Sequence, residues 1–304
     1  MESLTFDDTF SLAPSISMAP SKLNALTGEK SWDQQDTSAE IAQGESLHSD
    51  HWDELDASKF DVRGNNYLVD RQKISSAPNL LRLMAVDLLE VDEPLMDGFC
   101  SHPKGRVQRM LQLEKRNADV ASSQQMPSFV FCVNMVLPGP PNYHLVMYFA
   151  VDDMEGLGLS NPKAWQMLSP GSVNKPYSFQ LQQFLFGDSD EYRNKVLKMI
   201  PRITEGSFLL KTAVGTKPFI LGKYLKQTFV QGERFLEVIV DVGSSPTTQK
   251  LLGLKSVYKN KIVAGMAFVL EGIDEVSLPE NILCSVELNN EGFDGNIPFF
   301  DNTL

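Results

Sequence analysis

The sequence predicts an α+β fold, with a largely antiparallel sheet and a few short packing helices, in a single domain that follows a flexible N-terminal arm. First, β-rich runs arrive in pairs separated by turn residues instead of alternating with helices, which is typical of antiparallel sheets. Second, hydrophobic residues form 42% of the 304 residues, which is enough for a sizeable core. We expect an acidic arm over residues 1–50, a folded domain over 51–290 and a C-terminal tail over 291–304.

The N-terminal arm is set apart by its composition. Residues 1–50 mix Ser, Thr, Asp, Glu, Gln and Ala without sustained periodicity, and they contain nine acidic residues against two lysines. Such a segment buries too little apolar surface to offset its conformational entropy, so we expect it to gain order only through contacts. Short apolar patches at Phe6–Leu12 and Ile16–Leu26 leave two interpretations open, a plain tail and an extension that binds a partner or clamps a cofactor.

The first half of the folded domain contains the clearest hairpin. Phe129–Leu137 and Tyr143–Val151 are β-rich runs, and the segment Pro138-Gly139-Pro140-Pro141-Asn142 between them predicts a rigid turn. The apolar run Leu80–Val91 fits either a buried strand or a helix. Apolar spacing within Lys104–Asp119 predicts a short helix.

The second half combines strands with two further predicted helices. Residues 152–178 have the Gly, Pro, Ser and Asn content of a surface loop. Asp188 and Glu191 form a capping-box pattern ahead of an apolar stripe, which predicts a helix over Ser189–Ile200. The turn Gly243-Ser244-Ser245-Pro246 predicts the start of a helix that runs to about Tyr258. Strands are expected at Ser207–Ala213, Phe235–Val242, Ile262–Leu270 and Leu283–Leu288.

Composition excludes several classes of protein. A formal charge of −12 argues against non-specific binding to nucleic acid, which needs an excess of Lys and Arg. The longest apolar runs are strand-sized and far shorter than the roughly 20 residues of a transmembrane helix, so we predict a soluble protein for which peripheral membrane association stays open. The acidic N-terminus is unlike a secretory signal. Three cysteines spaced 32 and 152 residues apart fit no disulfide framework, which favours an intracellular location, cytoplasmic or peripheral to a membrane.

Gly243, Ser244 and Ser245 are the first candidate binding residues. A strand that ends in Gly-Ser-Ser-Pro before a helix directs free backbone N–H groups and hydroxyls out of the helix N-terminus, where proteins often hold phosphates and carboxylates. The competing interpretation, which we favour, is that one serine simply caps the helix, because almost every helix needs a cap.

Arg63 and Lys217 complete the set of candidate anion-binding residues. Lys217 belongs to the stretch from Ser189 to Arg234, which carries nine basic and four acidic residues. This stretch is a functional basic face, an ordinary solvated face, or a surface that binds the protein's own acidic arm. Arg63, between Val62 and Gly64, fits a structural ion pair or a donor to a backbone carbonyl better than a catalytic role. We predict no catalytic residue, no cofactor and no metal site, since the sequence lacks a nucleophile elbow, a phosphate-binding loop and metal-ligand spacing.

Four groups of motifs occur in order across about 237 residues, from Trp52 to Leu288. They are Trp52 with Phe60–Gly64, Tyr67–Asp70 and Lys73; Phe131–Asn134, Pro138-Gly139 and Val146–Phe149; Phe186–Asp188, Ile200–Ile203, Glu205-Gly206 and Ala213–Pro218; and Tyr224, Gly232, Glu237–Ser245, Ala267-Phe268 and Leu278–Glu280. In this order they resemble the C-terminal domain of the ENHANCED DISEASE RESISTANCE 2 family. The resemblance implies that Leu80–Val91 is a strand. Multidomain members of the family carry pleckstrin-homology and START domains before this region, and we expect neither here because only about 50 residues precede the match.

The resemblance implies a binding function and no reaction. We expect a non-enzymatic binding or adaptor module for a lipid-like or hydrophobic ligand, or for a membrane-associated protein partner. The alternative is a structural subunit of a larger assembly, with the N-terminal arm wrapped around a neighbour. Six aromatic residues on predicted strands either line a ligand pocket or pack the core: Phe131, Tyr148, Phe149, Phe208, Phe235 and Phe268.

Overall fold

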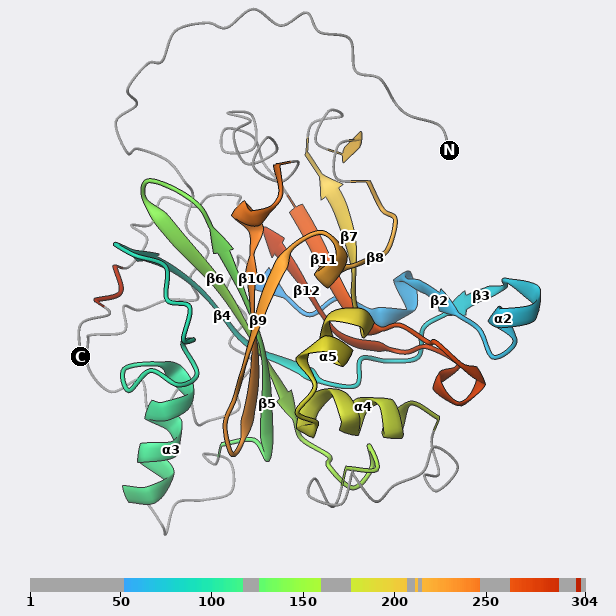
Figure 1. Ribbon diagram of the computed structural model, residues 1–304, viewed down its shortest axis with the longest axis horizontal. Coiled ribbons are helices and arrows are strands. Elements are labelled where there is room, and N and C mark those ends of the chain that lie inside the picture. Colours follow the sequence, from blue (N-terminus) through green and yellow to red (C-terminus); the bar gives the residue numbers. More distant parts are fainter. Residues whose placement is uncertain are drawn as a thin grey trace, which may run out of the picture.

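The computed structural model describes residues 52–116, 126–159, 176–206, 211–212, 215–246, 263–289 and 299–301. Within these residues the strands form two five-stranded sheets and one two-stranded ribbon (Figure 1). All but one of the pairings between these strands are antiparallel. The predicted α+β class is therefore confirmed, whereas the predicted arm over residues 1–50 lies outside the described residues.

The first sheet is built around the predicted hairpin. The hairpin strands pair from Phe129↔Val151 to Leu137↔Tyr143, as the turn at 138–142 predicts. β10 joins the sheet parallel to β5, and β9 then pairs antiparallel to β10 at the edge. The strand order is β4 (Arg82–Val91), β6 (Asn142–Val151), β5 (Phe129–Leu137), β10 (Phe235–Asp241) and β9 (Lys226–Gln231).

The second sheet is antiparallel throughout and gathers strands from both ends of the described chain. Its order is β1 (Trp52–Asp53), β12 (Ile282–Asn289), β11 (Val263–Leu270), β7 (Leu197–Glu205) and β8 (Phe219–Ile220). A separate ribbon pairs β2 (Asp61–Arg63) with β3 (Lys73–Ser75).

Short helices connect and cover the sheets. The α-helices are α2 (Tyr67–Asp70), α3 (Arg106–Arg116), α4 (Pro176–Phe186) and α5 (Asp190–Val196). The 3-10 turns are η1 (Ala57–Lys59), η5 (Leu221–Lys223), η6 (Val242–Ser244) and η7 (Glu275–Ser277).

The main core fills the space between the two sheets. Alternation along each strand directs one set of side chains inward, so Phe131 and Phe149 of the first sheet join Phe268 of the second in one buried cluster. The ring centroids of Phe149 and Phe268 lie 6.3 Å apart in an edge-to-face contact. Phe184 of α4 makes a similar contact with Phe131, with 5.5 Å between the ring centroids. Burial of each such ring contributes on the order of 1.5–3 kcal/mol to the free energy of unfolding. Of the six aromatic candidates, the five described ones are core residues, and Phe208 lies outside the described residues.

The outer faces of the two sheets carry smaller clusters. On the first sheet, Val107 and Met110 of α3 pack over Cys132 and Tyr148. Phe300 joins this cluster and meets Phe99 edge to face at 4.8 Å. On the second sheet, residues 55–62 cover a cluster of Leu55, Ala57, Phe60, Val62, Ile200, Ala267, Val269 and Ile282.

The predicted helix over Ser189–Ile200 is wrong beyond Val196. Its N-cap is Ser189, whose hydroxyl accepts from the Tyr192 N–H at 3.2 Å, and not Asp188. At Leu197 the chain becomes β7, because the same apolar residues also alternate and pair with β11 over its whole length. Pairing with β11 therefore stabilises this segment more than another turn of helix would.

Two further expectations need correction. The predicted loop over 152–178 missed the start of α4 at Pro176, whose inward face buries Leu181, Phe184 and Leu185. The strand expected at Ser207–Ala213 falls mostly outside the described residues, and Lys211 and Thr212, which are described, have helical backbone. The helix expected from Pro246 to Tyr258 also lies mostly outside them. The other expected strands are present, and so is the helix expected within Lys104–Asp119.

Candidate functional site

A cavity of about 300 Å³ opens where the β2–β3 ribbon meets the edge of the second sheet. The ribbon forms one wall, the segment Pro218–Tyr224 forms a second, and the β11–β12 connection forms a third. Its volume lies at the lower end of the roughly 300–1,000 Å³ usual for small-molecule sites. The lining residues are Asp61, Arg63, Tyr67, Lys73, Lys198, Ile200, Pro218, Phe219, Ile220, Lys223, Tyr224, Glu271 and Glu280.

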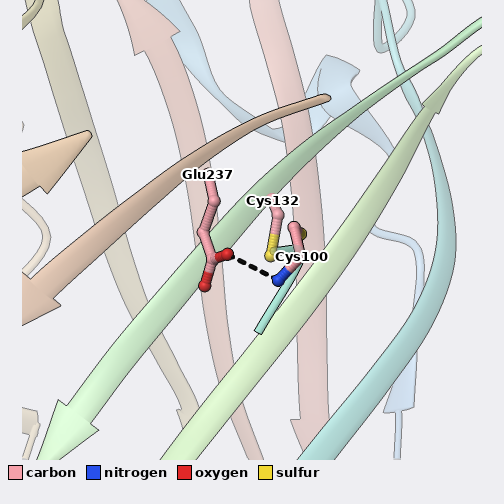
Figure 2. A group of neighbouring side chains, drawn as sticks. All are labelled: Cys100, Cys132 and Glu237. Atoms are coloured by element: carbon pink, nitrogen blue, oxygen red, sulfur yellow. Dashed lines mark hydrogen bonds between the residues drawn. The ribbon is translucent and has the colours of Figure 1, made fainter. Parts of the chain in front are cut away.

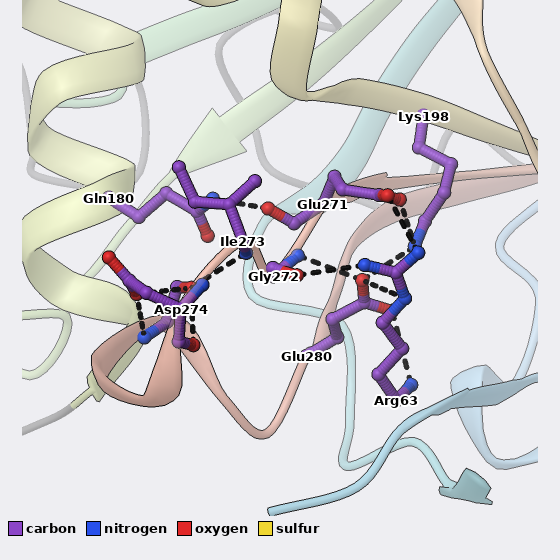
Figure 3. Close-up of polar contacts among 9 residues, drawn as sticks. Arg63, Gln180, Lys198, Glu271, Gly272, Ile273, Asp274 and Glu280 are labelled. Atoms are coloured by element: carbon purple, nitrogen blue, oxygen red, sulfur yellow. Dashed lines mark hydrogen bonds and ion pairs between the residues drawn. The ribbon is translucent and has the colours of Figure 1, made fainter. Parts of the chain in front are cut away.

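An ion-pair network forms the floor of this cavity (Figure 3). Arg63 Nη2 lies 2.6 Å from Glu271 Oε1, and Lys198 Nζ lies 2.6 Å from Glu280 Oε1 and 3.0 Å from Glu271 Oε2. The Glu280 side chain is 1% exposed and that of Lys198 is 7% exposed. Two cations and two carboxylates therefore balance each other where water is largely excluded, and loss of one partner would leave a buried charge unpaired.

Backbone contacts hold the network in place. Arg63 donates from Nη1 to the Gly272 carbonyl at 2.8 Å, and its own N–H donates to Glu280 Oε2 at 3.1 Å. The Glu280 N–H donates back to the Arg63 carbonyl at 3.0 Å. Local sequence makes this possible, because Asp274 and Ser277 form a capping box that closes the η7 turn between Gly272 and Glu280. The ribbon is thereby attached to the second sheet.

The mouth of the cavity carries two tyrosines and two further lysines. The Arg63 guanidinium lies 4.9 Å from the centre of the Tyr67 ring, and Tyr224 packs edge to face on Phe219 at 5.7 Å while remaining 64% exposed. Lys73 and Lys223 are exposed, and within the described residues their ammonium groups make no ion pair or hydrogen bond. These two lysines are the cations of the cavity that the network does not neutralise.

Large hydrophobic side chains are exposed on the elements that border this cavity. In the part of the chain that the structure describes, eight large hydrophobic residues are exposed. Six of them lie on α2 or β3, just after η5, or just before or within the η7 turn. The ribbon and the β11–β12 connection project on the same side of the molecule, at the right of Figure 1. We call these six the apolar rim: Leu68 (36% exposed), Val69 (85%), Ile74 (44%), Tyr224 (64%), Ile273 (58%) and Val276 (42%).

The structure does not bring the five predicted site residues together. Arg63 lines the cavity as a structural ion-pair partner and carbonyl donor, and the exposed Lys217 precedes Pro218 of its wall. Gly243, Ser244 and Ser245 follow β10 at the end of the first sheet. The Ser244 hydroxyl accepts from the Lys226 N–H at 2.9 Å and donates to the Asp241 carbonyl at 2.6 Å, so it joins β9 to β10. Anion binding at 243–245 stays a prediction.

The basic residues between Ser189 and Arg234 do not form one surface in the described part of the chain, because several of them make separate contacts. Arg193, Lys198 and Arg234 serve internal contacts: Arg193 donates to the Phe184 carbonyl, and Arg234 pairs with Glu114 at 2.5 Å. Lys195 pairs with Glu191 on the surface of α5. Sequence reasoning missed Lys198, Glu271, Glu280, Lys73 and Lys223 as site residues. A lysine between the core residues Leu197 and Met199 was the available signal, since a buried strand lysine needs an acidic partner.

A second, buried polar cluster lies on the outer face of the first sheet (Figure 2). Cys100, Cys132 and Glu237 place their ligand atoms within 4.8 Å of one another. The Glu237 carboxylate accepts from the N–H groups of Phe99 (3.0 Å) and Cys100 (2.8 Å) and from Asn134 Nδ2 (2.8 Å). Gly98 permits this approach, because a β-carbon there would lie 2.5 Å from Glu237 Oε2.

The chemistry of this cluster fits a structural role. Burial raises the pKa of the Cys132 thiol to about 11 and that of Cys100 well above its ordinary value, so both thiols are protonated at neutral pH. Burial likewise raises the pKa of Glu237. Both Glu237 oxygens are already hydrogen-bonded, so we assign the cluster the task of holding residues 98–100 against the sheet.

Fold and site together define a class, an α+β domain of two packed sheets with a charged, tyrosine-flanked cavity at one edge. Residues 52–291 match the family described as Protein ENHANCED DISEASE RESISTANCE 2, C-terminal, and the chain belongs to this family. A curated relative is the Protein ENHANCED DISEASE RESISTANCE 2-like of Arabidopsis thaliana, 30% identical over 239 residues, or 79% of this chain and 28% of that protein. The chain thus spans little more than a quarter of the relative's length. No solved structure gives a significant match.

Most residues that line the cavity belong to the motifs that carry the family resemblance. Of its thirteen lining residues, eight belong to the resembling motifs: Asp61, Arg63, Tyr67, Lys73, Ile200, Pro218, Tyr224 and Glu280. None of the helices within the described ranges is long and apolar enough to cross a membrane.

Proposed function

We propose that this domain is a non-enzymatic binding module that attaches peripherally to a lipid membrane. The observation that carries the proposal is the apolar rim, which lies on the elements that border a charged cavity. Val69 is 85% exposed and Ile273 is 58% exposed, and neither exposure serves the packing of the fold. Clustered apolar side chains with polar neighbours are the usual mark of an interaction surface.

The chemistry of the rim favours lipid over protein. Leu68 and Val69 lie on α2, and Ile273 and Val276 lie just before and within the η7 turn. Both turns are short and project from the molecule, a shape suited to insertion between headgroups. Tyr67 and Tyr224 have an apolar ring and a polar tip, the combination enriched at membrane interfaces. Lys73 and Lys223 add positive charge beside the rim, which anionic lipids attract. Each aliphatic side chain that becomes fully buried contributes on the order of 1.5–3 kcal/mol, so three or four suffice for measurable binding.

The alternative is a structural subunit of a larger assembly. In that case a protein neighbour would cover the same apolar rim, and the N-terminal arm would add further contacts. The two functions predict different binding partners for one surface, so a single pair of variants distinguishes them.

The test uses the full chain and vesicles of phosphatidylcholine with phosphatidylserine. We expect the wild type to sediment with the vesicles and the V69D/I273D variant to stay in the supernatant, because two carboxylates at the rim oppose insertion. M96D is the matched control, since Met96 is 42% exposed and lies outside the rim. These exposed sites should change stability by no more than roughly 0.5 kcal/mol each.

Two results would overturn membrane attachment. One is a wild type that does not sediment with vesicles, and the other is a V69D/I273D variant that sediments equally well. If the wild type instead purifies from its source in a complex of fixed mass that V69D/I273D fails to join, the assembly function replaces membrane attachment.

A further inference from the structure

The charged groups of the cavity fall into two sets. Arg63 and Lys198 are neutralised by Glu271 and Glu280 at 2.6–3.6 Å, and this inner set has no net charge. The outer set consists of Lys73, Lys223 and Asp61, all exposed at the mouth. The outer set leaves one net positive charge on the cavity, and its two lysines come from different walls, the ribbon and the η5 turn.

We infer that this cavity binds the phosphate group of a ligand between Lys73 and Lys223. The side chain of lysine ends in a flexible ammonium group with three donors, and two such groups from different walls of one cavity can bind a single phosphate. The inner network leaves no unpaired carboxylate to repel the anion, because Glu271 and Glu280 are already bonded to cations. Tyr67 and Tyr224 flank the same mouth with phenol groups, which hydrogen-bond phosphate oxygens.

Asp61 weakens this site. It lines the cavity on the same strand face as Arg63, two residues away, and is the only exposed carboxylate among the lining residues. A carboxylate in the same cavity opposes an incoming anion by charge repulsion. Removal of its charge should therefore tighten phosphate binding, an effect opposite in sign to removal of a lysine.

Phosphate binding at this site does not depend on membrane attachment. Only a phospholipid as the source of the phosphate rests on the proposed function. On a membrane, the apolar rim would insert and bring a phospholipid headgroup to the cavity mouth. A soluble phosphate ester would reach the same lysines without the rim. The shared chemistry is the phosphate group, and the two sources are separated by experiment.

The first arm of the test uses soluble probes, inorganic phosphate and glycerol 3-phosphate, with the full chain. Calorimetry should show binding to the wild type, and each probe should raise its melting temperature, since a ligand that binds only the native state stabilises it. In K73Q/K223Q binding should weaken by roughly tenfold per lysine. D61N should bind about two- to fivefold more tightly. K115Q/K226Q, which removes two exposed lysines that do not line the cavity, should match the wild type.

The second arm uses phosphatidylcholine vesicles with and without phosphatidic acid. Phosphatidic acid should strengthen wild-type binding, and K73Q/K223Q should lose that gain while V69D/I273D loses vesicle binding altogether. V69D/I273D should keep its affinity for soluble phosphate, so failure of membrane attachment leaves the phosphate site testable. Soluble binding without any vesicle response supports the site and identifies a soluble source. No response to either soluble probe, or equal responses in wild type and K73Q/K223Q, overturns the inference.

Discussion

At the scale of single residues, His144 shows how burial sets a protonation state. Its ring is buried in the first sheet, where Nδ1 lies 2.7 Å from Asn134 Oδ1 and Nε2 accepts from the Leu95 N–H at 3.1 Å. An imidazole that accepts at Nε2 must be neutral, with its proton on Nδ1. Burial lowers the pKa of His144 from 6.5 to about 4, because the charged form would lose its hydration.

This shift predicts a defined loss of stability in acid. The folded-state pKa lies below the unfolded value, so the unfolded chain binds the proton first and stability falls as pH drops from about 6.5 to about 4. The loss across that window is on the order of 3 kcal/mol. Urea unfolding of wild type and H144Q at pH 7, 5.5 and 4.5 should show a smaller pH slope for the variant. Parallel slopes for the two proteins would contradict a buried, neutral His144.

At the scale of elements, the β2–β3 ribbon depends on a partner that is distant in sequence. It has only three residue pairs of its own, and a ribbon of this size is not stable alone in water. Arg63 compensates by joining it to Glu271, Gly272 and Glu280, more than 200 residues away. These contacts therefore help to hold the ribbon as a wall of the cavity.

Replacement of Arg63 by Ala should loosen the ribbon before the rest of the fold. Amide hydrogen exchange in residues 61–75 should accelerate, while protection in β5 and β10 stays near the wild-type level. Arg82→Ala is the matched control, since Arg82 pairs with Asp152 at the surface, where both side chains are 50% exposed and such pairs contribute about 0–1 kcal/mol. If R63A and R82A give the same exchange pattern, the network does not hold the ribbon.

At the scale of the whole molecule, the two sheets share one core that spans most of the described chain. Trp52 and Leu288 lie in the same buried cluster and pair across β1 and β12, so the two ends of the family match meet in one sheet. The paired strands β1 and β12 are therefore close to opposite ends of the described chain. Non-local pairings of this kind slow folding, because the entropy of loop closure is lost before the contacts form.

The composition of residues 1–50 predicts how the intact chain will respond to protease. Limited proteolysis of the purified monomer should remove this arm first and leave a resistant core that begins near Trp52, because an acidic, apolar-poor segment gains order only through contacts. Mass spectrometry of the digest locates the cleavage. An N-terminus that survives as long as the core in the isolated monomer would show that the arm is held in cis.

The sequence by itself determined the fold class, the family and most strands. Local patterns suffice for these features: the hairpin at 129–151 follows from alternation and a proline-rich turn, and the motifs from Trp52 to Glu280 identify the family. Local patterns also misled, since the stripe at Ser189–Ile200 fits both a helix and the strand that β11 selects. Only the tertiary structure decided that Arg63, Lys198, Glu271 and Glu280 meet, because charge pairing depends on distances between segments that no local period encodes. The cavity and its apolar rim follow from that assembly. Gly243–Ser245 form a local turn pattern that is visible in the sequence, whereas Lys73 and Lys223 lie on separate elements that only the fold brings to one cavity.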